Sequence, residues 1–381
     1  MIRYKQTVMV ALLATGLAMG STAHANLLYN ITDLGTLGGG SSQGLGINAS
    51  GFVTGWAETN NGVYHAFITN SSEQMTDLGT LGGSNSAGYG INASGQVTGY
   101  SDIANNYGYH TAFVTSPSGT MSNLGSLGGG LRAGLSINDS GQVTGEADMT
   151  AFITNSSGQV SILSTLPGGS DGRGHSINAS GQVTGFSKTA DDIYHAFVTN
   201  ADGQIIDLGT LGRNNSSSMG YGINDSGQVT GQTDVVSGAS HAFITNTGGQ
   251  MVDLGSLDGY YESVGMGINA SGQVVGYSYT PSFYTTNGSN YHAFVTDNGF
   301  MKDINTLLVS SATGWELTNA IGINNSGQIT GAGIHNGLTH AFVLTPVSAV
   351  PVPSAIWLFG SGLGLLVFTR RKNKNIQLKD G

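Results

Sequence analysis

Histidine and aspartate recur at matched positions along this 381-residue chain, and both residue types can bind metal ions or move protons. Histidine opens the motif H-A-F-[IV] at His65, His195, His241, His292 and His340. One further copy is stretched to His110-Thr111-Ala112-Phe113, and in another Thr150 replaces the histidine. Aspartate opens D-L-G-[TS]-L at Asp33, Asp77, Asp207 and Asp253, and altered copies start at Asn123, Ile162 and Asp303. If either set met in a ring, imidazoles could bind a transition metal and carboxylates could bind Ca²⁺.

We expect both sets to be structural, because buried polar groups need partners and periodic residues serve the repeat itself. Each histidine would tether its repeat by hydrogen bonds, and each aspartate would accept from backbone donors at the crossover between repeats. If H-A-F forms a third strand, these residues lie midway out and cannot meet; if it forms the innermost strand, they line a channel. No D-x-D-x-D-G loop occurs. The sequence therefore predicts no cofactor, with Ca²⁺ as the open alternative.

A third motif, I-N-x-S-G, shows what must position these residues. It occurs seven times, about 46 residues apart on average, at Ile47, Ile91, Ile137, Ile177, Ile223, Ile268 and Ile323. Each repeat can be divided into four short strands, with an Asn-x-Ser-Gly type I turn between the first two. Four strands in about 45 residues are typical of a propeller blade.

The two ends of the repeat region predict closure into a ring. Residues 28–37 carry a fourth-strand motif with no repeat before it, and the last repeat ends with a third-strand motif at 341–344. The first strand can therefore complete the last blade, which places H-A-F in the third strand. We predict an all-β, seven-bladed propeller over residues 26–346; an open β-solenoid is the alternative.

Composition supports this fold and excludes one class of binding partner. The chain has 62 Gly, 6 Pro and no Cys, and only 9% of its residues are charged. Between residues 26 and 350 lie 5 of the 12 basic and 21 of the 22 acidic residues, a net charge of about −16. Such a surface repels phosphate backbones, so nucleic-acid binding is not expected.

The chain ends have the composition of targeting segments. Residues 1–25 are typical of a secretory signal peptide, with an A-x-A cleavage site formed by Ala23 and Ala25. After a linker at 347–353 that contains Pro351, Val352 and Pro353, residues 354–369 form an apolar stretch predicted as a single helix. Residues 370–381 are a basic tail that begins with Arg370 and Arg371, and we expect it to stay cytoplasmic.

Two family resemblances follow from these motifs. Residues 350–374 resemble the PEP-CTERM sorting segment of Gram-negative bacteria in the form V-P-x-P-S-A-x-W-L-F-G-S-G, with Val352 where the family has Glu. That resemblance implies handling by an exosortase-type enzyme, release to the surface or matrix, and a link to exopolysaccharide; a permanent C-terminal anchor is the alternative. Residues 28–346 resemble the HAF family of bacterial extracellular repeats, which implies secretion and no particular reaction.

No catalytic motif stands out in the sequence. There is no G-x-S-x-G, no H-E-x-x-H and no phosphate-binding loop. The longest departures from the repeat are aromatic and could stack on sugar rings or pack on their own blades; they contain Tyr279, Tyr284 and Trp315. We expect an exported, non-enzymatic binding or structural protein of the cell envelope or exopolysaccharide matrix. The alternatives are a polysaccharide-active enzyme at a channel mouth and an ice- or surface-binding protein that uses rows of Thr.

Overall fold

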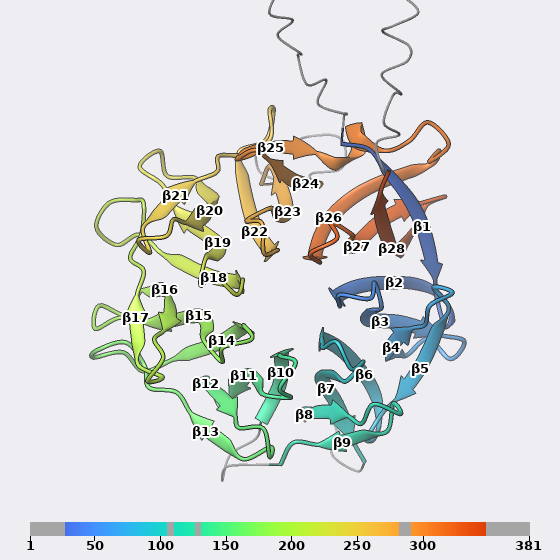
Figure 1. Ribbon diagram of the computed structural model, residues 1–381, viewed down its shortest axis with the longest axis horizontal. Coiled ribbons are helices and arrows are strands. Elements are labelled where there is room, and N and C mark those ends of the chain that lie inside the picture. The colour runs from blue at the N-terminus through green and yellow to red at the C-terminus, as the bar shows by residue number, and fades with distance from the viewer. Residues whose placement is uncertain (1–26, 105–109, 126–130, 282–290, 348–381) are drawn as a thin grey trace, which may run out of the picture. The chain divides into compact units, whose positions relative to one another are not determined.

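Seven four-stranded antiparallel sheets surround a common axis and form a β-propeller (Figure 1). This computed structural model describes residues 27–104, 110–125, 131–281 and 291–347. The predicted leader, apolar helix and basic tail lie outside the described residues, as do the processing residues Ala23, Ala25, Pro351, Val352, Pro353, Arg370 and Arg371. Among the described residues, no helix is both long enough and apolar enough to cross a membrane.

The first four blades follow the chain without interruption. Blade 1 contains β2 (Gly38–Ile47), β3 (Val53–Thr59), β4 (Tyr64–Thr69) and β5 (Met75–Gly79). Blade 2 contains β6 (Gly82–Ile91), β7 (Val97–Ile103), β8 (His110–Thr115) and β9 (Met121–Asn123). Blade 3 contains β10 (Leu131–Ile137), β11 (Val143–Ala147), β12 (Thr150–Thr154) and β13 (Val160–Ile162). Blade 4 contains β14 (Gly172–Ile177), β15 (Val183–Lys188), β16 (Tyr194–Thr199) and β17 (Ile205–Asp207).

The remaining three blades complete the ring. Blade 5 contains β18 (Ser218–Ile223), β19 (Val229–Asp234), β20 (Ser240–Thr245) and β21 (Met251–Asp253). Blade 6 contains β22 (Glu262–Ile268), β23 (Val274–Tyr279), β24 (Tyr291–Asp297) and β25 (Phe300–Asp303), and a 3₁₀ turn at Ile304–Leu307 follows it. Blade 7 contains β26 (Trp315–Ile323), β27 (Ile329–His335), β28 (Leu338–Pro346) and β1 (Tyr29–Gly35).

Closure of the ring depends on β1, the outermost strand of blade 7. β1 pairs antiparallel with β28, from Tyr29 opposite Pro346 to Gly35 opposite Ala341. Figure 1 shows this first strand beside β28, the last strand of the chain. The predictions of seven blades and of closure by the N-terminal strand are confirmed, and an open solenoid is excluded. H-A-F lies in the third strand of each blade, as the closure argument required.

The hydrophobic core lies between neighbouring blades. The phenylalanine of each H-A-F motif is fully buried, at Phe67, Phe113, Phe152, Phe197, Phe243, Phe294 and Phe342. Ala66 of blade 1 packs with Ile91, Val97 and Phe113 of blade 2, and the same arrangement recurs around the ring. Each blade therefore buries its apolar face against the next, so a single repeat cannot bury its core alone.

The I-N-x-S-G turn has the geometry that the sequence predicts. In blade 1 the amide of Gly51 donates to the carbonyl of Asn48, and Gly51 has a φ of 83°. The Asn48 side-chain oxygen also accepts from the amides of Ser50 and Phe52. Glycine adopts this left-handed conformation without strain, which accounts for its place in the motif.

Candidate functional site

The repeated histidines and aspartates are partners of one another. In blade 4 the Nδ1 atom of His195 lies 2.9 Å from a carboxylate oxygen of Asp207, and the same contact joins each remaining H-A-F histidine to an aspartate. These contacts are His65–Asp77, His241–Asp253, His292–Asp303 and His340–Asp33, at 2.8–3.0 Å. Each pair links a third strand to the fourth strand beside it. The sequence predicted hydrogen-bonded roles for both sets but not that they bond to each other.

The aspartates also bind the backbone. Asp207 accepts from the amide of Gly209, and Asp33, Asp77 and Asp253 accept from the glycine at the same offset. These bonds fix the backbone at the start of the crossover that leads to the next blade. Because each pair lies within the outer half of its own blade, the H-A-F histidines do not form a ring around the axis.

The two blades that depart from the motif change both partners together. In blade 2, Thr111 and Asn123 occupy the two positions, and the Thr111 hydroxyl donates to the Asn123 side chain at 3.0 Å. In blade 3, Thr150 and Ile162 occupy them, and the Thr150 hydroxyl donates to the carbonyl of Ala147 instead. The matched replacement indicates that the pair is a structural link within the blade.

The aromatic residues singled out from the sequence do not meet in one site. Tyr279 stacks on Tyr291 with ring centroids 5.3 Å apart, and it also contacts Tyr277. Trp315 stacks on His335 of its own blade, with centroids 4.5 Å apart and planes 6° apart. Tyr284 lies outside the described residues. Tyr279 and Trp315 therefore pack on their own blades.

Side chains from the innermost strands line a cavity of about 640 Å³ on the propeller axis. Each innermost strand has a β-bulge two residues before the motif isoleucine, for example between Gly44 and Gly46 in β2. The bulged residue is half-buried and lines the cavity in all seven blades. We call this set the bulge ring: Leu45, Tyr89, Leu135, His175, Tyr221, Met266 and Ile321.

A glycine of the second strand makes each bulge possible. In blade 4 a Cβ atom on Gly185 would lie 1.8 Å from the carbonyl oxygen of Arg173, just before the bulge. The equivalent glycines of the other blades face a carbonyl oxygen at 1.8–2.1 Å. This close approach explains the V-T-G motif, because any side chain would displace the bulge that directs the next residue into the cavity.

Polar and aromatic side chains from several blades also line the cavity. Four residues before the motif isoleucine, Gln43, Arg173 and Asn319 line it together with Tyr277 and Tyr291. The Arg173 guanidinium forms an ion pair with Glu146 and lies 5.9 Å from the centre of the Phe186 ring. The Gln43 amide donates to the Asn319 side chain at 3.4 Å. The lining therefore contains aromatic rings, planar amides and one charged group that is already paired.

Burial changes the acidity of three bulge-ring residues. Burial, and secondarily the charge of Arg173, lowers the pKa of His175 to about 3, so this imidazole is neutral at physiological pH. The His175 ring packs edge-on against Tyr221 at 4.8 Å. Burial raises the pKa of Tyr89 and of Tyr221 to about 12. These side chains are therefore uncharged at neutral pH where they line the cavity.

The other end of the same strands carries a closed ring of amides. The Nδ2 atom of Asn48 donates to the carbonyl of Asn92, that of Asn92 to Asn138, and so on around the propeller. Asn324 completes the circle by donating to the carbonyl of Asn48 at 3.0 Å. We call these residues the amide ring: Asn48, Asn92, Asn138, Asn178, Asn224, Asn269 and Asn324. The sequence predicted their turn but not this link between blades.

Comparison with known proteins identifies only the fold. No protein-family model and no curated protein matches this sequence. Virginiamycin B lyase from Staphylococcus aureus is similar in structure, with a TM-score of 0.51 and 11% identity over 84% of this chain and 100% of that one. The β-propeller domain of the Trilobed protease from Pyrococcus furiosus has a TM-score of 0.49 and 10% identity over 86% and 100% of the two chains. Puromycin hydrolase has a TM-score of 0.47 and 12% identity over 80% of this chain and 51% of its own.

Proposed function

We propose that this chain is an exported, non-enzymatic binding protein that holds a neutral saccharide of an extracellular polysaccharide in the axial cavity. One observation carries this proposal. Seven blades built on one repeat place five different residue types at the bulge ring, which lines a cavity of about 640 Å³. A repeat that keeps the asparagine of its innermost turn and the glycine opposite its bulge, but varies the bulged residue, which faces the cavity, is suited to recognition, because that position does not hold the scaffold together.

The chemistry of the cavity supports a saccharide. Tyr89, Tyr221 and Tyr277 present aromatic rings on which the apolar faces of sugars can stack. Gln43 and Asn319 present planar amides, which can donate to and accept from sugar hydroxyls. Because Arg173 is paired with Glu146 and the chain is strongly acidic, a neutral saccharide fits better than an anionic one.

Two other functions have less support. Glycoside hydrolysis generally uses a pair of carboxyl groups, and the described residues that line the cavity include no Asp or Glu. Ice binding requires rows of exposed threonines. The motif threonines are buried instead: the Thr54 hydroxyl donates to the carbonyl of Phe67, and that of Thr69 accepts from the amide of Val53.

The proposed location follows from the chain ends. A leader cleaved by signal peptidase after Ala25 would deliver the propeller across the inner membrane of a Gram-negative cell. The segment at 350–374 would then insert and be handled by an exosortase-type enzyme, or remain as an anchor. Both routes place the propeller at the cell envelope, the cell surface or in the extracellular matrix.

A glycan array tests the proposal directly. We would purify the exported protein, whose first residue should be Asn26, and apply it to neutral and acidic glycans with Ca²⁺ and with EDTA. We expect binding to neutral glycans that EDTA does not abolish and that leaves the glycan intact. Tyr221→Ala should weaken binding at least tenfold, since it removes a stacking ring from the cavity.

Tyr64→Ala is the matched control. Tyr64 is an exposed tyrosine of β4 that packs edge-on against Trp56 and does not line the cavity, so its loss should leave binding unchanged. Equal losses from both variants would contradict the assignment of the cavity. Cleavage of the glycan would overturn the non-enzymatic role, and the absence of binding to any neutral glycan would refute the ligand class.

A further inference from the structure

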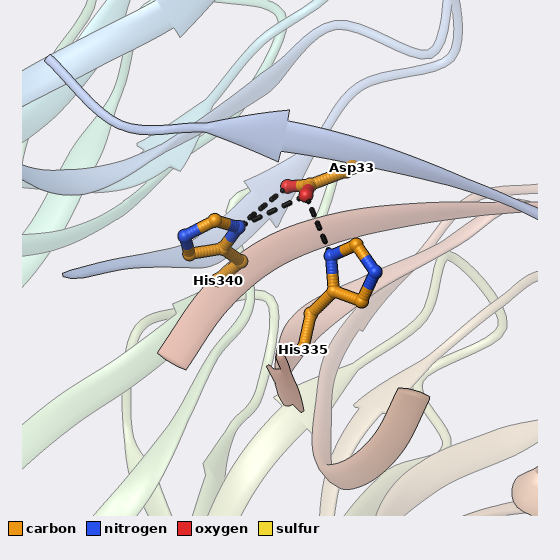
Figure 2. A group of neighbouring side chains, drawn as sticks. All are labelled: Asp33, His335 and His340. Atoms are coloured by element: carbon orange, nitrogen blue, oxygen red, sulfur yellow. Dashed lines mark hydrogen bonds and ion pairs between the residues drawn. The ribbon is translucent and has the colours of Figure 1, made fainter. Parts of the chain in front are cut away.

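Blade 7 differs from the other blades in having a second histidine at its aspartate. Asp33 of β1 accepts from His340 of β28 through both carboxylate oxygens, at 2.9 and 3.0 Å. His335, at the end of β27, lies outside the H-A-F motif and places its own Nδ1 atom 3.0 Å from Asp33 Oδ2. Figure 2 shows both rings turned with a nitrogen toward the same carboxylate. One ligand atom from each of the three residues lies within 4.8 Å of the others.

We propose that Asp33, His335 and His340 form a Zn²⁺ site that fastens the N-terminal strand to the last blade. Two imidazole nitrogens and one carboxylate oxygen are a common donor set for Zn²⁺, with bonds of about 2.0–2.2 Å. Ligand atoms on a tetrahedral ion at that bond length are about 3.3 Å apart. The separations of Asp33 from His335 and His340, 2.9–3.0 Å, therefore need to widen by only a few tenths of an ångström, and the two imidazole nitrogens lie within 4.8 Å of each other.

The surroundings of the site suit a bound ion. All three residues come from strands of one sheet, and the His335 ring is held against Trp315 with centroids 4.5 Å apart. A separate cavity of about 260 Å³, lined by Asp33, Trp315 and His335, leaves room for a water molecule as the fourth ligand. Coordination through Nδ1 moves the imidazole proton to Nε2. The Asn336 amide lies 3.3 Å from Nε2 of His335, and after a flip its carbonyl oxygen can accept a hydrogen bond from Nε2–H.

The other blades provide an internal comparison. Among the described residues, no other His–Asp pair gains a third ligand within the same distance. At the blade 6 pair, Glu316 of β26 in blade 7 lies 4.0 Å from Nε2 of His292, whereas Asp303 lies at Nδ1, so these two carboxylates are on opposite edges of the ring. The extra histidine is therefore a property of the blade that closes the propeller.

The position of the site links metal binding to closure. Asp33 is separated from His335 and His340 by 302 and 307 residues. The contacts of these three residues connect β1 with β28, its neighbour, and with β27. An ion that needs all three ligands can bind only when β1 is paired with the last blade. Its binding free energy therefore stabilises the closed ring. This inference is independent of the proposed saccharide site, because it concerns a different cavity and different residues.

Titration with ZnCl₂ tests the site. We expect the purified full chain to bind one Zn²⁺ per molecule by calorimetry after treatment with a chelator. At a hundredfold excess of Zn²⁺ over its Kd, the Tm should rise by about 3–6 °C. Hydrogen exchange of the β1 amides should slow on addition of Zn²⁺, while exchange in β5, the outermost strand of blade 1, should not change.

His335→Gln is the decisive variant, because it removes the third ligand and leaves the Asp33–His340 pair in place. It should weaken Zn²⁺ binding at least tenfold and abolish the slower exchange in β1. His65→Gln alters the equivalent two-residue pair of blade 1 and should leave the affinity for Zn²⁺ unchanged. The proposal fails if the wild-type chain binds no Zn²⁺ stoichiometrically, or if His335→Gln binds it as tightly as the wild type. Either result would leave the glycan experiment unaffected.

Discussion

The amide ring follows the bulge ring by three residues, in the turn after each innermost strand, yet one is invariant and the other carries five residue types. Asn178 is 3% exposed, and it bonds to its own turn and to the next blade. His175, three residues earlier, is half-buried and contacts the aromatic rings of Phe186 and Tyr221. In this propeller a side chain is invariant where it holds the next blade and varies where it faces the cavity.

The difference has a physical cause. An asparagine of the amide ring satisfies polar atoms of two blades at once, so replacing it leaves buried donors and acceptors without partners. A bulge-ring side chain faces the cavity, so a different side chain changes the cavity lining and little of the packing between blades. The seven repeats thus separate the requirements of stability from those of recognition within one strand.

The largest effect should come from the amide ring. Asn178→Ala removes two accepted and two donated hydrogen bonds, and we expect the free energy of unfolding to fall by about 3–4 kcal/mol in denaturant titration. Asn178→Asp keeps the acceptor for the turn amides but loses both donated bonds, to the carbonyl of Asn224 and to the side chain of Gln182. It should therefore destabilise the protein as well, which separates the loss of the donated bonds from the loss of the bonds accepted from the turn amides. If both variants lower the free energy of unfolding by less than about 1 kcal/mol, the amide ring does not hold the blades together, and its contrast with the bulge ring fails.

An intermediate effect is expected at His175 under acidic conditions. Its pKa is about 3 in the folded chain and close to 6.5 in an unfolded one, so between these values the unfolded state binds more protons. Stability should therefore fall as the pH is lowered from about 6.5 toward 3. Because part of the ring faces water in the cavity, we expect the His175 contribution to be about 1–3 kcal/mol at pH 4.

His175→Gln should therefore lose less stability than the wild type between pH 7 and pH 4, measured by urea titration at each pH. Leu135→Gln is the control, because it alters another bulge-ring position that does not titrate in this range. Parallel pH dependences for the wild type and His175→Gln would show that the imidazole is not the acid-sensitive group.

The fold could be predicted because its signals are local and repeated. The Asn48–Gly51 turn, its copies and the unpaired motifs at the two ends specify the number of blades and the closing strand without any long-range contact. The third-strand place of H-A-F followed from the same closure argument.

The site could not be predicted in the same way, for two reasons. A strand that alternates strictly places every second residue on one face, and only the bulge at Gly44 and Gly46 directs Leu45 into the cavity. His335 lies in no repeated motif, and its partner Asp33 is 302 residues away, so only the closed ring brings the two together. The matched losses of histidine and aspartate in blades 2 and 3 were the one sequence signal that could have identified the pairs.

The smallest effect on stability should come from a bulge-ring residue that does not titrate. Met266→Ala removes a half-buried side chain from the wall of the cavity, and we expect the free energy of unfolding to change by less than about 1 kcal/mol. Val274→Ala in the same blade removes a fully buried side chain and should lower stability by about 2 kcal/mol or more. The same Met266→Ala protein should change its Kd for a bound glycan by at least threefold, because the lining of the cavity changes. If Met266→Ala lowers the free energy of unfolding as much as Asn178→Ala does, the bulge ring holds the blades together. The variation of the bulge ring between repeats would then need a cause other than recognition.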